Sequence, residues 1–352
     1  MAKQVHVGFI GAGNIARAHA HGILAAGGKI LGAVDQDLPR ARDFAHQFSA
    51  DFAANNPAKL LKLDRLDAVL VCSPNAFHAP HAIAALQAGK HVFCEKPMAV
   101  SAPLCQQMIQ TARRARRLLT IGYCRRFMPG NELIKSKIET GELGNVYYAE
   151  SRWFRRRGAP GLGGWFTTKK LSGGGPLIDL GCHMLDLVLW FLGHPRAVRV
   201  SAVSGCHLAN RQDYCAMSMW APPKLTAKPC CDVEDYASAI VRFANGTNLL
   251  LQTSWAINMP DSERIETWLA GDKAGCVSGN KIEFVGQDGG GLTNTVYQVP
   301  EHRCFEHQMF HFLDCVGNGA KPRVKAEEAL MVQKILDAVY QSSRLKREIV
   351  IR

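Results

Sequence analysis

A glycine-rich turn near the N-terminus restricts the fold more than any other feature of this chain. The apolar run Val5–Ile10 leads into Gly11-Ala12-Gly13-Asn14-Ile15-Ala16, and a helical stretch, Ile15–Ala26, follows. In a βαβ unit this pattern binds a dinucleotide. The first glycine permits a tight turn, the second lets the backbone approach a pyrophosphate, and the small sixth residue lets the helix pack on the strand. The unpaired N–H groups of the helix then face the phosphate. The predicted cofactor contacts here are Gly11, Gly13, Asn14 and Ile15.

The second predicted strand, Ile30–Val34, ends at a carboxylate. Asp35 lies 22 residues beyond Gly13, the distance expected of the group that binds the adenosine ribose hydroxyls. A carboxylate there repels a 2′-phosphate, so NAD is favoured over NADP as the cofactor. Two alternatives stay open at this point. Arg40, about one helical turn further on, could receive that phosphate, and Asp35 could merely cap the following helix.

Strands and helices alternate through the first part of the chain. Short apolar runs predict buried parallel strands, and the segments between them have helical character. The predicted strands are Val5–Ile10, Ile30–Val34, Ala68–Cys72, His91–Cys94 and Leu118–Ile121, and the predicted helices are Ile15–Ala26, Arg40–Gln47, His78–Gln87 and Ala102–Arg116. This spacing implies right-handed crossovers, and therefore an α/β Rossmann domain with a doubly wound parallel sheet over residues 1–123.

From about Tyr123 the pattern changes to longer strands. They are predicted at 146–154, 196–205, 236–244, 247–255, 264–270 and 281–285, and Asn245-Gly246 is a strong hairpin signal. One helix, Pro176–Leu192, interrupts this region, and another, Ala326–Ser342, precedes the C-terminus. The pattern predicts an α+β domain over residues 124–352 with an open, mostly antiparallel sheet.

Composition excludes several classes of protein. A chain of 352 residues with 47% hydrophobic and 20% charged residues is typical of a globular protein of two domains. It has no apolar run long enough to span a membrane and no secretion signal at its N-terminus, so we expect a cytoplasmic protein with no membrane partner. The net charge of +12 comes largely from arginine runs that lack interleaved aromatic residues, which argues against a nucleic-acid partner.

The twelve cysteines are scattered and include no C-x-x-C pair. We therefore expect reduced thiols and no metal site. The segment Cys206–Cys231 is the one place where cysteines gather, with His207 nearby, and we expect an irregular insertion there. His307 and His311 lie four apart beside Glu306, but without a third anchored ligand a position on a helix surface is the better interpretation.

Two further motifs resemble a known family. The first is Cys72-Ser73-Pro74-Asn75-Ala76-Phe77-His78 followed by Gly89-Lys90-His91-Val92-Phe93-Cys94-Glu95-Lys96-Pro97, and the second is Gly173-Gly174-Gly175-Pro176-Leu177-Ile178-Asp179-Leu180-Gly181-Cys182-His183. Together with the N-terminal turn they resemble the Gfo/Idh/MocA oxidoreductases, the relatives of glucose–fructose oxidoreductase and inositol dehydrogenase. The resemblance covers nearly the whole chain.

The resemblance implies a Rossmann domain followed by a substrate domain whose open sheet forms homodimers or homotetramers. It implies that Lys96 and His183 lie beside the nicotinamide, with Asp179 in support, and that Lys96-Pro97 is a dipeptide often cis in relatives. Further positions match residues that line the cofactor, namely Ser73, Asn75, His78 and Glu95.

The residues themselves suit oxidation of a secondary alcohol, which needs a base for the hydroxyl proton. His183 titrates nearest neutral pH, and Asp179, four residues earlier on a helix begun by Pro176, either orients His183 or contacts a substrate hydroxyl. The Lys96 ammonium would stabilise alkoxide character, and whether Lys96 or His183 takes the proton stays open. Taken singly, each has a structural alternative: a surface lysine, a first-turn carboxylate and a core histidine.

Signals for the substrate are weaker. Trp165 borders a glycine-rich loop and would stack on a sugar ring, although tryptophans also fill cores. Arg126 resembles a family position near the mouth of the cofactor site. Arg155–Arg157 could receive an anionic group, but a solvated loop is the simpler explanation.

Three hypotheses for function follow. The first is an NAD-dependent dehydrogenase that acts on a secondary alcohol of a sugar, glycoside or cyclitol and releases a keto-sugar or keto-cyclitol. The second is a redox-cycling NAD-dependent glycosidase or lyase that oxidises a ring hydroxyl, eliminates and returns the hydride, with Tyr123 or Tyr148 as a further acid or base. The third is a non-catalytic NAD sensor, which would not need Lys96, Asp179 and His183 together. The first is favoured.

Overall fold

The computed structural model describes residues 4–215, 231–279, 281–299 and 303–351. The chain divides into two compact units, of which unit 1 comprises Met1–Phe127 and Arg303–Gln333 and unit 2 comprises Met128–His302 and Lys334–Arg352. A return segment late in the sequence thus belongs to unit 1. The predicted domain boundary between residues 123 and 124 stays a prediction beside this spatial division.

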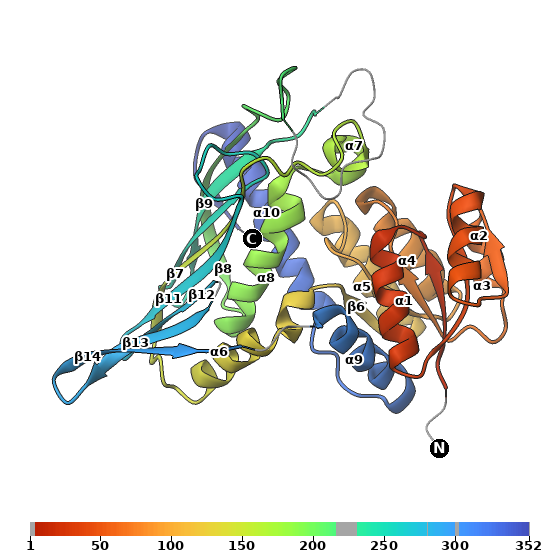
Figure 1. Cartoon of the computed structure of the whole chain (residues 1–352), viewed down its shortest axis with the longest axis horizontal. Coiled ribbons are helices and arrows are strands. Elements are labelled where there is room, and N and C mark those ends of the chain that lie inside the picture. The colour runs from red at the N-terminus through yellow and green to blue at the C-terminus, as the bar shows by residue number, and fades with distance from the viewer. Residues whose placement is uncertain (1–3, 216–230, 280, 300–302, 352) are drawn as a thin grey trace. The chain divides into compact units, whose positions relative to one another are not determined.

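Unit 1 is built on a six-stranded parallel sheet (Figure 1). Its order is β3-β2-β1-β4-β5-β6, so the chain builds outward from β1 and then resumes at β4 on the other side of β1. Ligands of such sheets bind at the carboxyl ends of the strands near this switch point. The strands are β1 (His6–Ile10), β2 (Lys29–Val34), β3 (Phe52–Ala54), β4 (Ala68–Val71), β5 (His91–Cys94) and β6 (Leu119–Ile121). The predicted doubly wound sheet is confirmed, although the short β3 was not predicted.

Helices cover this sheet, and most begin at residues suited to a helix N-terminus. Proline occupies the first turn of α2 and α5, and Asp37 and Asn56 cap α2 and α3 with their side chains. A buried apolar cluster joins β1 and β2 to α1, α2 and α9. The helices are α1 (Asn14–Ala25), α2 (Leu38–Gln47), α3 (Pro57–Leu61), α4 (His78–Gln87), α5 (Ala102–Ala115) and α9 (Cys304–Asn318).

Unit 2 contains, within its described residues, a nine-stranded mixed sheet of order β14-β13-β12-β11-β7-β10-β9-β8-β15. Only β7 and β10 pair in parallel, and the other neighbours are antiparallel, as predicted. Gly246 turns the β9–β10 hairpin with a φ of +90°. The strands are β7 (Val146–Arg155), β8 (Ala197–Gly205), β9 (Tyr236–Phe243), β10 (Asn248–Ser254), β11 (Glu263–Gly271), β12 (Gly275–Ser278), β13 (Ile282–Asp288), β14 (Gly291–Tyr297) and β15 (Ile349–Val350).

A buried helix covers one face of this sheet, its inner face. On the inner face, Ala149 and Ser151 of β7 are fully buried, and β7 packs against helix α8 (Cys182–Phe191). Nine of the ten residues of α8 are buried, as expected of a helix that is apolar on all sides. The remaining helices of unit 2 are α6 (Pro129–Glu139) and α7 (Lys169–Ser172), and α10 (Ala326–Leu345) begins in unit 1 and ends in unit 2.

Candidate active site

The glycine-rich turn of unit 1 has the geometry that a bound pyrophosphate requires. Gly11 has a φ of +97°, and a Cβ at this position would lie 2.5 Å from the carbonyl oxygen of Cys72, so the protein itself demands glycine. A Cβ on Gly13 would meet nothing within 4 Å. Gly13 is therefore not needed for packing, and it leaves open space at the N-terminus of α1. The residues present fit a dinucleotide phosphate.

The carboxylate of Asp35 is fixed beside this turn. Its Oδ2 accepts the Ala12 N–H at 3.0 Å, and its Oδ1 accepts the Asp37 N–H at 3.0 Å. Asp37, rather than Asp35, caps α2 by accepting the Arg40 N–H, so the capping alternative for Asp35 is wrong. The Arg40 guanidinium lies 3.5 Å from Asp35 and 3.2 Å from Asp37, which places two carboxylates against its charge.

A histidine joins the two loops that follow β4 and β5. His78 is buried, and its ring nitrogens lie 2.8 Å from the Ser73 carbonyl oxygen and 2.7 Å from the Pro97 carbonyl oxygen. Burial lowers the pKa of His78 although both carbonyls oppose that shift. Nearby, His81 Nδ1 lies 3.0 Å from the Ser73 hydroxyl, and burial together with His78 lowers the pKa of His81 to about 4. Asn75 is also buried, in the short helix η1 (Asn75–Phe77).

Glu95 anchors the residue that carries the predicted catalytic ammonium. Its Oε1 accepts a hydrogen bond from His19 Nε2 at 2.6 Å, and its Oε2 accepts the Lys96 N–H at 3.0 Å. Burial raises the pKa of Glu95, but the bond and charge of His19, with the charge of Lys96, outweigh this and hold the pKa low. Lys96 is half-buried, and the Lys96-Pro97 peptide is cis. Within unit 1, Glu95 thus fixes the backbone of Lys96 from inside.

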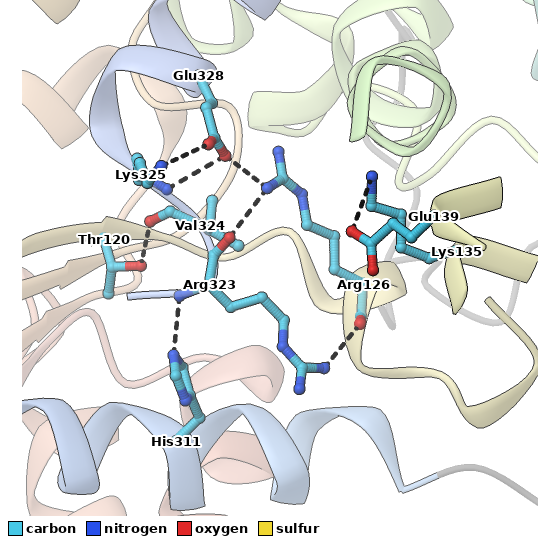
Figure 2. Close-up of polar contacts among 9 residues, drawn as sticks. All are labelled: Thr120, Arg126, Lys135, Glu139, His311, Arg323, Val324, Lys325 and Glu328. Carbon is cyan, nitrogen blue, oxygen red and sulfur yellow. Dashed lines mark hydrogen bonds and ion pairs between the residues drawn. The ribbon is translucent and has the colours of Figure 1, made fainter. Parts of the chain in front are cut away.

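Arg126 lies in a polar cluster inside unit 1 (Figure 2). Its side chain is fully buried, and Nη1 donates to Glu328 Oε2 at 2.6 Å and to the Arg323 carbonyl oxygen at 3.0 Å. Arg323 donates back to the Arg126 carbonyl oxygen, and its guanidinium lies over the Phe127 ring at 4.6 Å. These contacts tie the segment before α10 to the short helix η2 (Cys124–Phe127). The predicted substrate role of Arg126 stays a prediction.

His311 belongs to the same cluster in Figure 2. His311 is half-buried on α9, and its Nε2 accepts the Arg323 N–H at 2.9 Å. The sequence does not reveal this contact because its partner lies beyond the end of α9. Burial, and then the charge of Arg323, lower the pKa of His311.

In unit 2, packing explains the second glycine motif. A Cβ on Gly174 would lie 1.9 Å from the Tyr340 hydroxyl, and a Cβ on Gly175 would lie 1.9 Å from the Glu234 carbonyl oxygen. The Glu234 carboxylate accepts the N–H groups of Gly175 and Leu177 and the hydroxyl of Tyr340. Burial raises the pKa of Glu234. Glu234 thus holds the start of the helix that presents the predicted catalytic residues, and sequence reasoning missed it because no motif marks it.

Asp179 and His183 lie on either side of a change in helix type. Asp179 is in a π-helical turn, Leu177–Gly181, and His183 is in the first turn of α8. The predicted helix Pro176–Leu192 is thus present, with a π-helical turn before its α-helical part. Single π-helical turns are frequent at functional sites. Both residues are nevertheless presented by one continuous helical segment.

Two tryptophans contact these residues. Trp255 is fully buried, and its Nε1 donates to Asp179 Oδ2 at 3.0 Å. The ring of Trp153, on the inner face of β7, lies 5.9 Å from the His183 ring between centroids. Glu263 accepts hydrogen bonds from both Trp153 Nε1 and Arg155 Nε at 2.8 Å. Arg155 is therefore paired with a carboxylate.

Trp165 stacks on Phe166, with ring centroids 3.7 Å apart, in the short helix η3 (Trp165–Thr167). Its predicted contact with substrate stays a prediction. Arg157 donates to Asn258 Oδ1 at 2.6 Å and borders a cavity of about 190 Å³ in unit 2. None of the residues predicted for catalysis lines this cavity, whose walls are Arg157, Leu208, Arg211, Asp213, Tyr214, Cys215 and Asn258.

No group of His, Cys, Asp or Glu side chains suited to a metal occurs among the described residues. Residues 216–230 of the expected insertion, Cys230 among them, lie outside the described residues. At the edges of this segment, the Asp235 carboxylate accepts the N–H groups of His207, Leu208 and Ala209. In the described part of the chain, no helix has the length and apolarity that crossing a membrane requires.

A parallel sheet with an open glycine turn and a fixed carboxylate after its second strand is typical of the class of dinucleotide-binding proteins. Family comparison agrees. Residues 5–123 match the model of the oxidoreductase family with an NAD-binding Rossmann fold, and residues 135–351 match the model of its C-terminal alpha/beta domain. The chain belongs to the Gfo/Idh/MocA family of oxidoreductases.

Several relatives bear names of sugar enzymes. The chain is 32% identical to a D-glucoside 3-dehydrogenase of Escherichia coli over 97% of this chain and 96% of that protein. It is 35% identical to a glucose-6-phosphate 3-dehydrogenase of Bacillus subtilis over 53% of each chain. Among solved structures, a levoglucosan dehydrogenase in complex with NADH and levoglucosan is similar, with a TM-score of 0.86 and 19% identity, covering 99% of this chain and 100% of that one. This last likeness shows the fold.

Proposed function

We propose that this protein is an NAD-dependent dehydrogenase that oxidises a secondary alcohol of a sugar, glycoside or cyclitol to a ketone. The observation that carries the proposal is the joint presentation of Asp179 and His183 by one helical segment of unit 2. A carboxylate and an imidazole so placed supply the acid–base chemistry that alcohol oxidation requires. The dinucleotide turn of unit 1 supports the same conclusion.

Within unit 1, the N-terminus of α1 behind Gly11 and Gly13 would hold the pyrophosphate, and Asp35 would bind the adenosine ribose. Ser73, Asn75, His78 and Glu95 complete the proposed cofactor site. NAD is proposed over NADP because the Asp35 carboxylate repels a 2′-phosphate and Arg40 already faces two carboxylates. When bound, NAD supplies the hydride acceptor.

The side chains of this chain would handle the proton and the charge. We assign His183 as the base for the hydroxyl proton and Lys96 as the donor that stabilises alkoxide character on the reacting oxygen. Asp179 either polarises His183 or accepts a hydrogen bond from a substrate hydroxyl.

D-Glucosides are the first substrates to test. A relative that matches along nearly its whole length is named a D-glucoside 3-dehydrogenase, and a partial match is named a glucose-6-phosphate 3-dehydrogenase. Inositols and 1,5-anhydro sugars complete the panel. Trp165 and Arg126 are retained as proposed substrate contacts.

Two variants test the proposed roles. Lys96→Met and His183→Ala should each lower turnover by about a hundredfold or more while NAD affinity changes little. Lys90→Met is a matched control, because it makes the same substitution at the opposite end of β5: Lys90 precedes this strand, whereas Lys96 follows it. Undiminished turnover in either variant would remove that residue from the mechanism, and equal loss in Lys90→Met would indicate general damage.

The outer face of the nine-stranded sheet is the proposed surface for a homodimer or homotetramer. Register places Val203, Ile240 and Trp268 on this face, where they are 56%, 43% and 41% exposed. Around them, charged side chains form pairs across strands, such as Arg242 with Glu348. An apolar patch with a charged rim is typical of an interface between protein chains.

A further inference from the structure

Trp255 follows the last residue of β10 and is the largest fully buried side chain among the described residues. It packs in an apolar cluster with Leu180, Leu162 and Val233. Bulk alone does not account for a tryptophan here, because a buried indole N–H requires an acceptor. That acceptor is Asp179 Oδ2, at 3.0 Å.

The backbone of Trp255 is fixed independently of Asp179. Its N–H donates to the Asp235 carbonyl oxygen at 2.9 Å, and its carbonyl oxygen accepts the Gly158 N–H at 2.7 Å. Before it, the Ser254 hydroxyl also donates to the Asp235 carbonyl oxygen. With its main chain bound on both sides and its ring enclosed, the indole is the rigid partner in the bond to Asp179.

Asp179 is the more adaptable partner. It is half-buried and lies in the π-helical turn Leu177–Gly181. Its N–H donates to the Gly175 carbonyl oxygen at 3.0 Å. An aspartate side chain can rotate about two bonds, so a carboxylate that no rigid group holds would sample several orientations. The bond from the enclosed indole selects one of them.

The chemistry of the donor also matters. An indole N–H is neutral, donates only and does not exchange roles with its acceptor. A hydrogen bond to a carboxylate favours its charged form.

We propose that Trp255 is a positioning residue for the reaction, whose indole N–H orients the Asp179 carboxylate. This inference rests on the proposed function, since it assigns Asp179 a part in catalysis. It narrows that part, because an oriented Asp179 carboxylate serves to polarise His183 or to accept a hydrogen bond from a substrate hydroxyl. Trp255 itself touches neither substrate nor cofactor in this proposal.

Trp255→Phe removes the N–H and keeps most of the ring. We expect turnover to fall roughly tenfold to a hundredfold, as for loss of a hydrogen bond to a charged group, with a smaller change in KM. Trp190→Phe, at the far end of α8, is the matched control and should retain wild-type turnover. Wild-type turnover in Trp255→Phe would overturn the positioning role.

A second measurement needs no activity. In the indole region of a ¹H–¹⁵N spectrum, the Trp255 signal is identified by its loss in Trp255→Phe. It should shift in Asp179→Asn, whereas the Trp190 signal should not. An unmoved Trp255 signal would overturn the inference whatever the enzyme does. If the signal shifts but the wild-type protein oxidises no member of the sugar panel, the bond stands while the proposed function, and the catalytic role built on it, fail.

Discussion

Asp35 and Asp37 stand two residues apart and have separate tasks. Asp35 is bound to the glycine-rich turn through the Ala12 N–H, whereas Asp37 caps α2 and pairs with Arg40. Both are carboxylates at the carboxyl end of β2, so the sequence alone left the capping role open. The structure separates them by the hydrogen bonds that each accepts.

The separate roles of Asp35 and Asp37 predict different effects of substitution. Asp35→Ala should weaken NAD binding by about tenfold or more, because the ribose loses a charged acceptor, and should reduce discrimination against NADP. Asp37→Ala should cost about 1 kcal/mol of stability through the lost cap and leave NAD affinity nearly unchanged. Calorimetric titration of each variant measures its affinities for NAD and NADP, and denaturant unfolding measures its stability. NAD affinity that survives Asp35→Ala would contradict the ribose assignment.

Histidine burial in unit 1 predicts a dependence of stability on pH. The pKa of His81 is lowered from 6.5 to about 4, so the unfolded chain binds a proton more readily than the folded protein between these values. The free energy of unfolding should therefore fall as pH drops through this window, by less than about 1.4 kcal/mol per pH unit for a partly exposed group. Above pH 6.5, His81 is mostly neutral in the folded and the unfolded chain, so its protonation no longer lowers the free energy of unfolding.

Denaturant unfolding at several pH values checks this dependence. His81→Gln should flatten the decline in stability, whereas His46→Gln, at an exposed position on α2, should not. A decline that is as steep in His81→Gln as in the wild-type protein would show that other groups cause it. His78 and His311, whose pKa values are lowered in the same direction, would then be the next candidates.

At the scale of elements, two glycines illustrate different constraints. Gly13 opens α1 with empty space beside it, whereas Gly175 is pressed against the backbone of Glu234. Gly13→Ala should leave stability within about 1 kcal/mol and weaken NAD binding, because only the cofactor would meet the new methyl group. Gly175→Ala should destabilise unit 2 by several kcal/mol, since backbone must move. Thermal unfolding and NAD titration of both variants distinguish the cases. Equal NAD affinity in Gly13→Ala and the wild-type protein would argue against a pyrophosphate at this turn.

Local patterns predicted most elements. The boundaries of α4 and β5 match the predicted ones, and Gly246 forms the expected hairpin, because these features depend on neighbouring residues. The support around Asp179 was not predictable in this way. Glu234 lies 59 residues from Gly175, and Trp255 lies 76 residues from Asp179. Contacts over such separations arise only when the sheet of unit 2 has formed, and no single-sequence pattern encodes them. The π-helical turn and the burial of Arg126 belong to the same category.

At the scale of the whole molecule, the outer face of the nine-stranded sheet predicts self-association. Ile240→Glu places a charge among exposed apolar side chains and should dissociate the oligomer without unfolding the chain, because Ile240 is already 43% exposed. Phe310→Glu, at a similarly exposed position on α9 of unit 1, is the control. Light scattering after size-exclusion chromatography gives the mass of each variant. A wild-type protein that runs as a monomer, or an Ile240→Glu variant with unchanged mass, would remove this face as the interface.

We propose that this chain oxidises a sugar hydroxyl and releases the reduced cofactor. The most direct measurement incubates the purified protein with NAD and each D-glucoside, anhydro sugar and inositol, and follows nicotinamide absorbance and keto product together. We predict NADH and keto-sugar in equal amounts with at least one member of the panel. Cleavage of a glycoside without accumulation of NADH would contradict the claim and identify the redox-cycling reaction instead.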